Sequence, residues 1–278
     1  MKRFTGITLV LSGVCALFGI LFLLAGSVLG AGIGDFSDLF LNGFFSTGWY
    51  KEGTVGDGKA VRKEESFPAS EIEKLDFELS VGELCIEENI ENPDQILVVT
   101  EVKNARVDVK QEKGCLEISE DTGKLFRNNH SGVKITVYLP KDKVYQEIDA
   151  EVSVGSMVSE LENLSAQKVS LDSATGEIQV EAIEVYQDLD VECSVGSVSI
   201  KKLNVSGDVD VDCGVGEVNL DIYGQKEDFN YVLDCGIGEI LIGQDSYSGL
   251  GNSTKIDYQS NKKATVDCGV GSVKLSFF

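Results

Sequence analysis

Acidic side chains recur at one fixed position of a phrase that the sequence repeats. The phrase has the form "DVDVDCGVGEVNL" (208–220), and the residue four places before its second glycine is acidic in all seven copies. If the copies stack as strands in register, neighbouring carboxylates lie about 4.8 Å apart and form a column on one outward face. The acidic residues are Glu78, Glu151, Asp172, Glu192, Asp212, Asp234 and Asp267.

This acidic column has two interpretations. A cation could bridge neighbouring carboxylates, with ligands from Asp172, Glu192, Asp212 and Asp234. Calcium, however, takes roughly six to eight oxygen ligands, which a line of carboxylates on a flat face does not supply. Repulsion between neighbouring carboxylates in water costs only on the order of 1 kcal/mol per pair, so no cation is required. We therefore predict a solvated acidic face, with no metal site and no cofactor.

A cysteine follows the acidic residue in four copies of the phrase. These cysteines are Cys193, Cys213, Cys235 and Cys268. The other copies have leucine, valine or serine there, so we expect a small buried side chain. Zinc sites favour close pairs such as C-x-x-C, which are absent. We expect the first three cysteines to stack one above another with the fourth next, as free thiols. Cys85 and Cys115 have outward parity, and a disulfide between them remains an alternative.

The sequence offers little for catalysis. Its one histidine, His130, lies in an expected turn, "RNNHSG", with no obvious nucleophile beside it. No nucleophile elbow, phosphate-binding loop or zinc-hydrolase motif is present. A β-helix lyase is the natural enzyme alternative, but an acidic face would repel an acidic polysaccharide. With 46 acidic and 24 basic residues, the chain is also a poor ligand for nucleic acid.

The elements that position these residues follow from the same phrase. Before the glycine, apolar residues alternate up to Val215 in one copy and up to Ile237 in the next; after it, the apolar parity flips. A strand changes its buried face only at a bend, and glycine suits such a corner. The glycines from Gly155 to Gly238 are 20 to 22 residues apart. We predict an all-β fold, a right-handed β-solenoid with coils of about 20 residues.

The solenoid needs covered ends, because open sheet edges invite pairing with other chains. Residues 95–139 alternate with a period of two between short turns, which predicts an antiparallel meander that precedes the solenoid and caps it. The last residues, "LSFF" (275–278), are expected to close the other end.

The N-terminal residues are different in character. Lys2 and Arg3 are followed by no charged residue until Asp35, and such an apolar run is typical of a transmembrane helix. The positive-inside rule places its N-terminus in the cytoplasm and the remainder outside. Cleavage near 29–32 is an alternative. We divide the chain into a cytoplasmic tip and transmembrane helix (1–33), a juxtamembrane segment and linker (34–66) and an extracytoplasmic solenoid domain (67–278).

Three stretches resemble a known family. They are "LDFELSVGELCIEE" (75–88), "VYLPKD" (137–142) leading into "SVGSMV" (153–158), and the repeated "VDCGVGEVNL" (211–220). They are similar to the bacterial putative-adhesin β-strand-repeat domain, a domain of unknown function found in membrane-anchored envelope proteins. The resemblance covers residues 67–278. It implies a solenoid fold and a site outside the cytoplasm, and it brings no established catalytic residues.

We therefore expect a single-pass membrane protein that acts as a binding or structural, adhesin-like module of the cell envelope. Its partners would be the membrane, through the N-terminal helix, and an envelope or surface protein or glycan. The alternative is an accessory protein in envelope-stress signalling, and a polysaccharide-active β-helix enzyme comes third.

Overall fold

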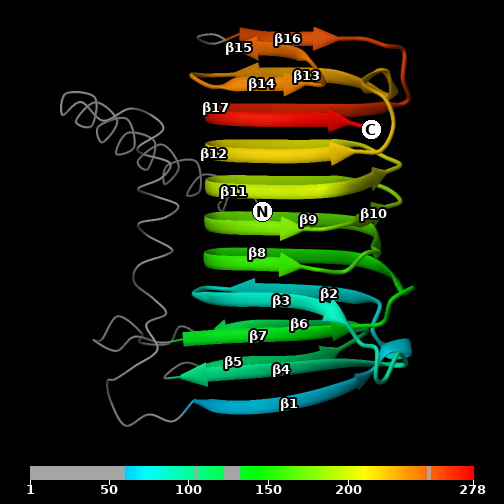
Figure 1. Ribbon diagram of the computed structural model, residues 1–278, viewed down its shortest axis with the longest axis vertical. Coiled ribbons are helices and arrows are strands. Elements are labelled where there is room, and N and C mark those ends of the chain that lie inside the picture. Colours follow the sequence, from blue (N-terminus) through cyan, green and yellow to red (C-terminus); the bar gives the residue numbers. More distant parts are fainter. Residues whose placement is uncertain (1–59, 104–105, 122–131, 249–251) are drawn as a thin grey trace, which may run out of the picture. The chain divides into compact units, whose positions relative to one another are not determined.

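Every strand among the described residues belongs to one hydrogen-bonded sheet, which winds into a stack of coils (Figure 1). The computed structural model describes residues 60–103, 106–121, 132–248 and 252–278. The strands are β1 (Val61–Pro68), β2 (Lys74–Leu79), β3 (Gly82–Glu88), β4 (Gln95–Lys103), β5 (Arg106–Glu112), β6 (Cys115–Asp121), β7 (Gly132–Leu139), β8 (Val144–Ser159), β9 (Leu164–Val180), β10 (Ile183–Val185), β11 (Leu189–Val205), β12 (Val209–Ile222), β13 (Phe229–Cys235), β14 (Glu239–Ile242), β15 (Asp245–Ser248), β16 (Asn252–Ile256) and β17 (Lys262–Phe277).

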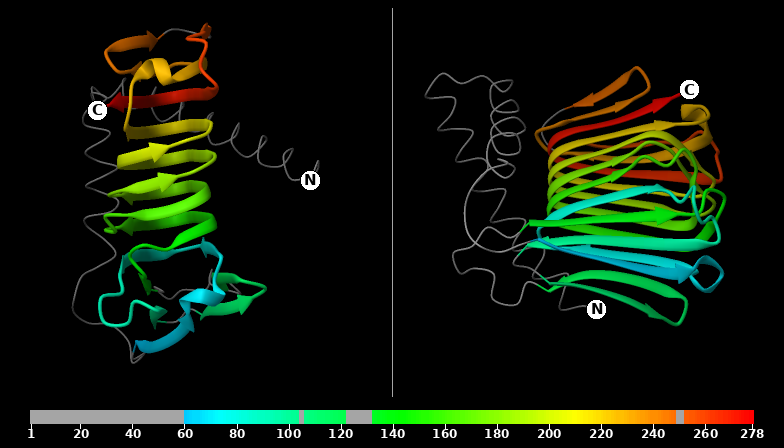
Figure 2. Two further views of the ribbon diagram at one scale, coloured as in Figure 1. Left: turned by 90° about the vertical axis from the view of Figure 1, so that its right-hand side faces the viewer. Right: turned by 60° about the horizontal axis from the view of Figure 1, so that its bottom comes forward.

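The long strands form the coils of the solenoid. Strands β8, β9, β11, β12 and β17 each turn a corner at the glycine of the phrase and continue on a second side of the stack (Figure 2). They pair in parallel and in register, so that Gly176 lies against Gly155 and Gly196, and Gly216 lies against Gly196 and Gly271. Each copy of the phrase therefore forms one corner of a coil, and the corners of successive coils stack on one another.

The corner requires glycine because the backbones of adjacent coils approach closely there. A Cβ atom added to Gly216 would overlap the carbonyl oxygen of Gly196, and one added to Gly196 would overlap that of Gly176. Gly196 also has a φ of +147°, a conformation that L side chains rarely adopt. Close stacking is thus the main constraint at Gly216, and backbone conformation adds to it at Gly196.

The core lies between the two sides of each coil. Val209, Val211 and Cys213 are buried before the corner, and Val218 and Leu220 are buried after it, as the alternation predicts. Two expected inward residues are not buried. Val215 is half-buried and Ile237 is 63% exposed.

The prediction for these two residues was wrong because the bend spans more than one residue. In the coil of β12, the last buried residue before the corner is Cys213 and the next buried residue is Val218. The register with β11 also passes from Cys213 directly to Val215. The side chain just before the glycine therefore points away from the core.

The predicted fold class is corrected at its N-terminal end. Among the described residues no helix is long and apolar enough to cross a membrane, and their helical segments are two short 3-10 turns, Ala69–Glu71 and Lys226–Asp228. Because the described sequence alternates apolar and polar residues with a period of two, it forms strands. The fold of the described residues is therefore all-β, and the transmembrane helix that we included in the fold class is not among their elements. Residues 1–33, to which that helix was assigned, lie outside the described residues.

The boundary expected at residue 67 also differs from the structure. Strand β1 begins at Val61 and pairs with β4 in antiparallel register from Val61–Val102 to Pro68–Gln95. Residues 61–68 therefore form an edge strand of the sheet, whereas a flexible linker would have no strand partner. The start of the solenoid therefore includes the end of the segment we assigned to a linker.

The segment 95–139 is not a simple meander placed before the solenoid. Strands β6 and β7 run parallel to β2 and β3 and form a further coil beneath them. Strands β5 and β4 pair antiparallel with β6 and β7, and β1 closes this end. The prediction was wrong because a period of two identifies strands but does not choose their partners.

The C-terminal strand is inside the stack rather than at its end. Strand β17 pairs in parallel with β12 on one edge and with β13 and β14 on the other, so it separates strands that are adjacent in sequence (Figure 1). The end is formed by β16 on β13 and β15 on β14, both antiparallel. The expectation that 275–278 closes the solenoid was therefore wrong.

Candidate functional site

The acidic column predicted from the sequence forms along one side of the stack. The strands before each corner bring its members into register in the order Glu78, Glu151, Asp172, Glu192, Asp212, Asp267 and Asp234. Of the four carboxylates considered as ligands of a bridging cation, Asp172, Glu192 and Asp212 lie on consecutive strands. Asp234 is separated from Asp212 by Asp267, because β17 lies between their strands.

A second acidic column, which we did not identify in the sequence, runs beside the first. Two residues earlier in each strand the structure aligns Asp76, Asp149, Ser170, Asp190 and Asp210. The signal was present in stretches such as "DLDVE" (188–192), where acids occupy successive outward positions of a strand. We define the acidic face as both columns together: Asp76, Glu78, Asp149, Glu151, Asp172, Asp190, Glu192, Asp210, Asp212, Asp234 and Asp267.

Within the described part of the chain, no basic side chain pairs with this face. Among the described residues, none of its eleven carboxylates forms an ion pair with a lysine or arginine. The nearest pair in the same strands is at the margin, where Lys74 Nζ lies 2.5 Å from Glu147 Oε2. The acidic face therefore presents uncompensated negative charge to solvent.

Crowding changes the acidity of these groups. Partial burial, together with the charges of Glu192 and Glu151, raises the pKa of Asp172 to about 6. Partial burial, together with Glu78 and Asp149, raises the pKa of Asp76 to about 6. The pKa values of Asp149, Asp190, Asp212 and Asp267 are also raised, first by burial and then by nearby carboxylates. A negative charge is thus costly here, and an external cationic group would relieve that cost.

The face does not form a coordination site for a metal ion. The described residues contain no group of three or more histidine, cysteine, aspartate or glutamate side chains placed to hold one. Carboxylates in straight columns on a sheet point outward side by side and do not converge on one point. Such an array suits long-range attraction of a positively charged surface.

The opposite side of the stack has a different charge pattern. Just after each corner, the outward column is Glu83, Ser156, Glu177, Ser197, Glu217, Ser272 and Glu239 in spatial order. Glutamate and serine alternate, so no two of these carboxylates occupy neighbouring coils. The alternation depends on β17, which places Ser272 between Glu217 and Glu239. Uncompensated charge is therefore concentrated on the acidic face.

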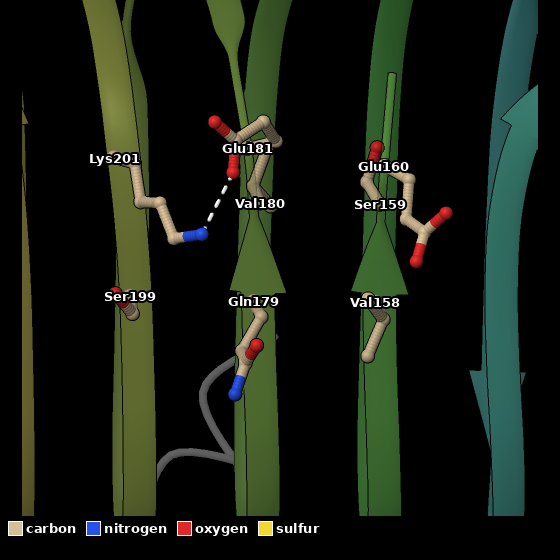
Figure 3. Close-up of a pocket in the computed structure, with 8 residues that line it drawn as sticks. All are labelled: Val158, Ser159, Glu160, Gln179, Val180, Glu181, Ser199 and Lys201. Atoms are coloured by element: carbon tan, nitrogen blue, oxygen red, sulfur yellow. Dashed lines mark hydrogen bonds and ion pairs between the residues drawn. The ribbon is translucent and has the colours of Figure 1, made fainter. Parts of the chain in front are cut away.

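The depression on this second side has a mixed polar and apolar lining. It is lined by Val158, Ser159, Glu160, Gln179, Val180, Glu181, Ser199 and Lys201. Figure 3 shows Lys201 reaching across to Glu181, with Nζ 2.8 Å from Oε2. Lys201 is the one basic residue among the lining residues, and this ion pair engages it. The lining residues include two serines and no histidine. The depression does not assemble a nucleophile with a base.

The four phrase cysteines form a buried ladder in a corrected order. Cys193 pairs with Cys213, Cys213 with Cys268, and Cys268 with Cys235. All four are buried, and Cys193, Cys213 and Cys268 are free thiols. Hydrogen bonding of the protonated Cys213 thiol to the sulfur atoms of Cys193 and Cys268, together with burial, raises the pKa of Cys213. The order we expected was wrong because β17 enters the stack below β13.

Cys85 and Cys115 do not form the disulfide that the sequence left open. Cys85 lies in β3 beside Thr136 and Val158, whereas Cys115 lies in β6 beside Lys74, on another side of the coil. Both are free, and partial burial raises the pKa of each thiol. His130 lies outside the described residues.

Comparison with known families agrees with this architecture. The family model described as Toastrack DUF4097 matches residues 72–226, which is more than half of the chain. The chain belongs to the Toastrack DUF4097 family. The match includes the first five phrase glycines, from Gly82 to Gly216, so it covers the coils from β2 to β12. A search of the curated proteins finds no match.

Solved structures similar to this Toastrack chain have distant sequences. A "putative cell adhesion protein" from Clostridium sporogenes is 16% identical, covers 79% of this chain and 100% of its own, and has a TM-score of 0.39. A "putative adhesin" from Parabacteroides distasonis is 16% identical, with 79% and 98% covered and a TM-score of 0.33. A "putative lipid binding protein" from the same organism is 15% identical, with 78% and 98% covered and a TM-score of 0.32. The function of this chain is therefore argued from its own residues.

Proposed function

We propose that this Toastrack chain is a non-enzymatic, adhesin-like binding module of the cell envelope, whose acidic face attaches to a positively charged protein or glycan surface outside the cytoplasm. The observation that carries the proposal is the pair of acidic columns, which form no ion pair with any basic residue that the structure describes. Their strands hold the carboxylates rigidly in register, so little conformational entropy is lost when a partner binds.

The charge pattern supports binding at one side of the stack. On the acidic face, carboxylates occupy neighbouring coils, whereas on the opposite side Glu177 and Glu217 are each flanked by serines. A cationic partner would therefore gain more on the acidic face. It would also relieve the repulsion that raises the pKa values of Asp76 and Asp172.

The test compares two triple variants of the full chain with the same change in net charge. The first is Asp190→Asn, Asp210→Asn and Asp212→Asn on the acidic face. The second is Glu177→Gln, Glu217→Gln and Glu239→Gln on the opposite side. Binding to surfaces coated with poly-lysine is measured by interferometry over a series of salt concentrations, with poly-glutamate as the negative surface.

We expect the first variant to bind several-fold more weakly and with a smaller salt slope, because fewer charges are neutralised on binding. The second variant should remain close to the parent chain. Equal losses in both variants would mean that net charge alone drives attachment, and the acidic face would not be the site.

A further inference from the structure

The two ends of the stack differ in the protection of their sheet edges. At one end β1 pairs only with β4, and β5 pairs only with β6. At the other, β16 pairs only with β13, and β15 pairs only with β14. Each of these four strands thus has one edge whose backbone groups have no partner strand among the described residues (Figure 1). Such edges are templates for pairing with another chain unless they are protected.

The end formed by β1 and β5 is protected by charge. Strand β1 carries Arg62–Glu64 and Lys63–Glu65 ion pairs along its length, both at 2.7 Å. Strand β5 carries the Arg106–Asp108 ion pair at 2.9 Å. Charged side chains on an edge strand disfavour pairing with another strand, because their solvation would be lost.

The end formed by β15 and β16 has less of this protection, because each of its two strands carries only one charged residue. Strand β16 has the sequence "NSTKI" and its only charged residue is Lys255; strand β15 is "DSYS", and its Asp245 is held 2.6 Å from Lys226 Nζ. The inward side chains at this end, Tyr247 and Ile256, are only half-buried although they pack against the core. This end therefore combines an unpaired edge, partly exposed apolar core and little net charge.

We propose that the end formed by β15 and β16 binds the same end of a second copy of this chain, with β16 paired antiparallel to β16 of that copy. The local charge favours a second copy as occupant. Two bodies with a net charge of −22 each repel one another, so they associate most easily where their surfaces are neutral. The acidic faces, which lie along the sides of the stack, stay exposed in this arrangement.

The sequence of β16 is compatible with pairing to itself. An antiparallel, two-fold arrangement centred on Thr254 places Thr254 opposite its copy, Ser253 opposite Lys255, and Asn252 opposite Ile256. No like charges lie directly opposite one another, and threonine pairs across antiparallel strands are favourable. Isologous pairing of this kind closes at two copies and does not continue into a fibre. The proposal does not depend on what the acidic face binds.

The experiment is intermolecular cross-linking at matched positions of the two ends. Ser253 in β16 and Ser66 in β1 are both exposed serines on terminal strands, so Ser253→Cys and Ser66→Cys are a matched pair. The full chain is used with Cys15, Cys85 and Cys115 changed to serine, in a molar excess of detergent micelles. A short bismaleimide is added at micromolar chain concentration, and covalent dimers are separated on a denaturing gel.

We expect a covalent dimer with Ser253→Cys and none with Ser66→Cys. Adding Ile256→Lys to the first variant should abolish the dimer, because it places an inward charge at the paired end. Adding Val109→Lys, at a half-buried position of β5, should leave the dimer intact. Circular dichroism and urea titration establish that both lysine variants are folded.

Three results would overturn the proposal. The first is the absence of a dimer with Ser253→Cys. The second is an equal yield of dimer with Ser253→Cys and Ser66→Cys, which would mean that the two ends do not differ. The third is a dimer that persists in a folded Ile256→Lys variant. If that variant does not fold, the comparison of Ser253 with Ser66 still decides the matter. Poly-lysine binding by the triple variants is measured separately, so either proposal can fail alone.

Discussion

At the scale of single residues, Asp172 shows how crowded carboxylates affect stability. Its neighbours in the column are Glu151 and Glu192, and the pKa is raised to about 6 in the folded state. The folded chain therefore binds protons more tightly than the unfolded chain. Stability must fall as pH rises from the unfolded pKa, near 4, through the folded pKa. This is opposite to the usual behaviour of a salt-bridged aspartate.

We predict that the chain resists urea better at pH 5 than at pH 7.5, and that Asp172→Asn reduces this difference. The amide removes a repelled charge, so the variant should be more stable than the parent at pH 7.5 by about 0.5–1 kcal/mol. Urea titrations at both pH values measure the effect. Glu217→Gln is the control, since Glu217 lies between Ser197 and Ser272; an equal gain there would contradict the crowding argument.

Gly216 illustrates a constraint from the neighbouring coil. A Cβ atom there would overlap the carbonyl oxygen of Gly196, so any side chain pushes the two coils apart. We predict that Gly216→Val destabilises the fold by about 2 kcal/mol or more, and that Glu217→Ala costs much less because Glu217 is exposed. Coincident urea melts of the two variants would show that the corner tolerates a side chain.

Cys213 lies in the middle of the buried thiol ladder, between Cys193 and Cys268. We predict that Cys213→Ser costs little, because Ser173 already occupies this column and is fully buried. Cys213→Asp should cost several kcal/mol, because it buries an unpaired charge. Mass spectrometry after alkylation should find the four ladder thiols unmodified in the folded chain and modified after denaturation. Rapid labelling of the folded chain would contradict their burial.

At the scale of elements, the main feature is the insertion of β17 between β12 and the β13–β14 pair. It gives each long strand a parallel neighbour on both edges, and it decides which side chains are adjacent at this end. On the acidic face it brings Asp267 between Asp212 and Asp234. On the opposite side it places Ser272 between Glu217 and Glu239, which removes a repulsion that stacking in sequence order would create.

This order of strands predicts which engineered cysteines can be linked. Asp212 and Asp267 are direct neighbours, about 4.8 Å apart at Cα, whereas Asp212 and Asp234 are about twice that distance apart. Because a disulfide needs Cα atoms within about 7 Å, any disulfide formed on oxidation should join Asp212→Cys to Asp267→Cys, and none should join Asp212→Cys to Asp234→Cys. Peptide mapping under non-reducing conditions distinguishes the two. The opposite result would mean that the coils stack in sequence order.

For the whole molecule, the net charge of −22 opposes compaction, and on the acidic face carboxylates occupy neighbouring coils. Screening by salt should therefore stabilise the fold. We predict that the thermal midpoint rises when sodium chloride is increased from about 20 to about 300 mM, a range over which the Debye length falls several-fold. The triple variant of Asp190, Asp210 and Asp212 should show a smaller rise. A midpoint that does not change with salt would show that this repulsion is negligible.

The sequence by itself determined the local geometry of the coil. Alternation with a period of two assigns each residue to the core or to solvent, so Val211 and Cys213 are buried and Asp212 is exposed. The change of parity at each glycine locates the corner, and equal spacing of the glycines predicts that acids of successive copies align. These properties follow from the geometry of a strand and of its immediate neighbours. The acidic column could therefore be predicted, although we overlooked the second column beside it.

Which strands are neighbours follows from long-range packing and could not be predicted from the phrases. All phrases satisfy the same register, so the sequence does not distinguish β13 from β17 as the strand above β12, or a meander from the parallel coil of β6 and β7. The choice depends on long-range pairing, on charge across the sheet and on which strands can cover the ends. The exposure of the Ile237 side chain also depends on tertiary structure, because the packing of the next coil determines how many residues the corner spans.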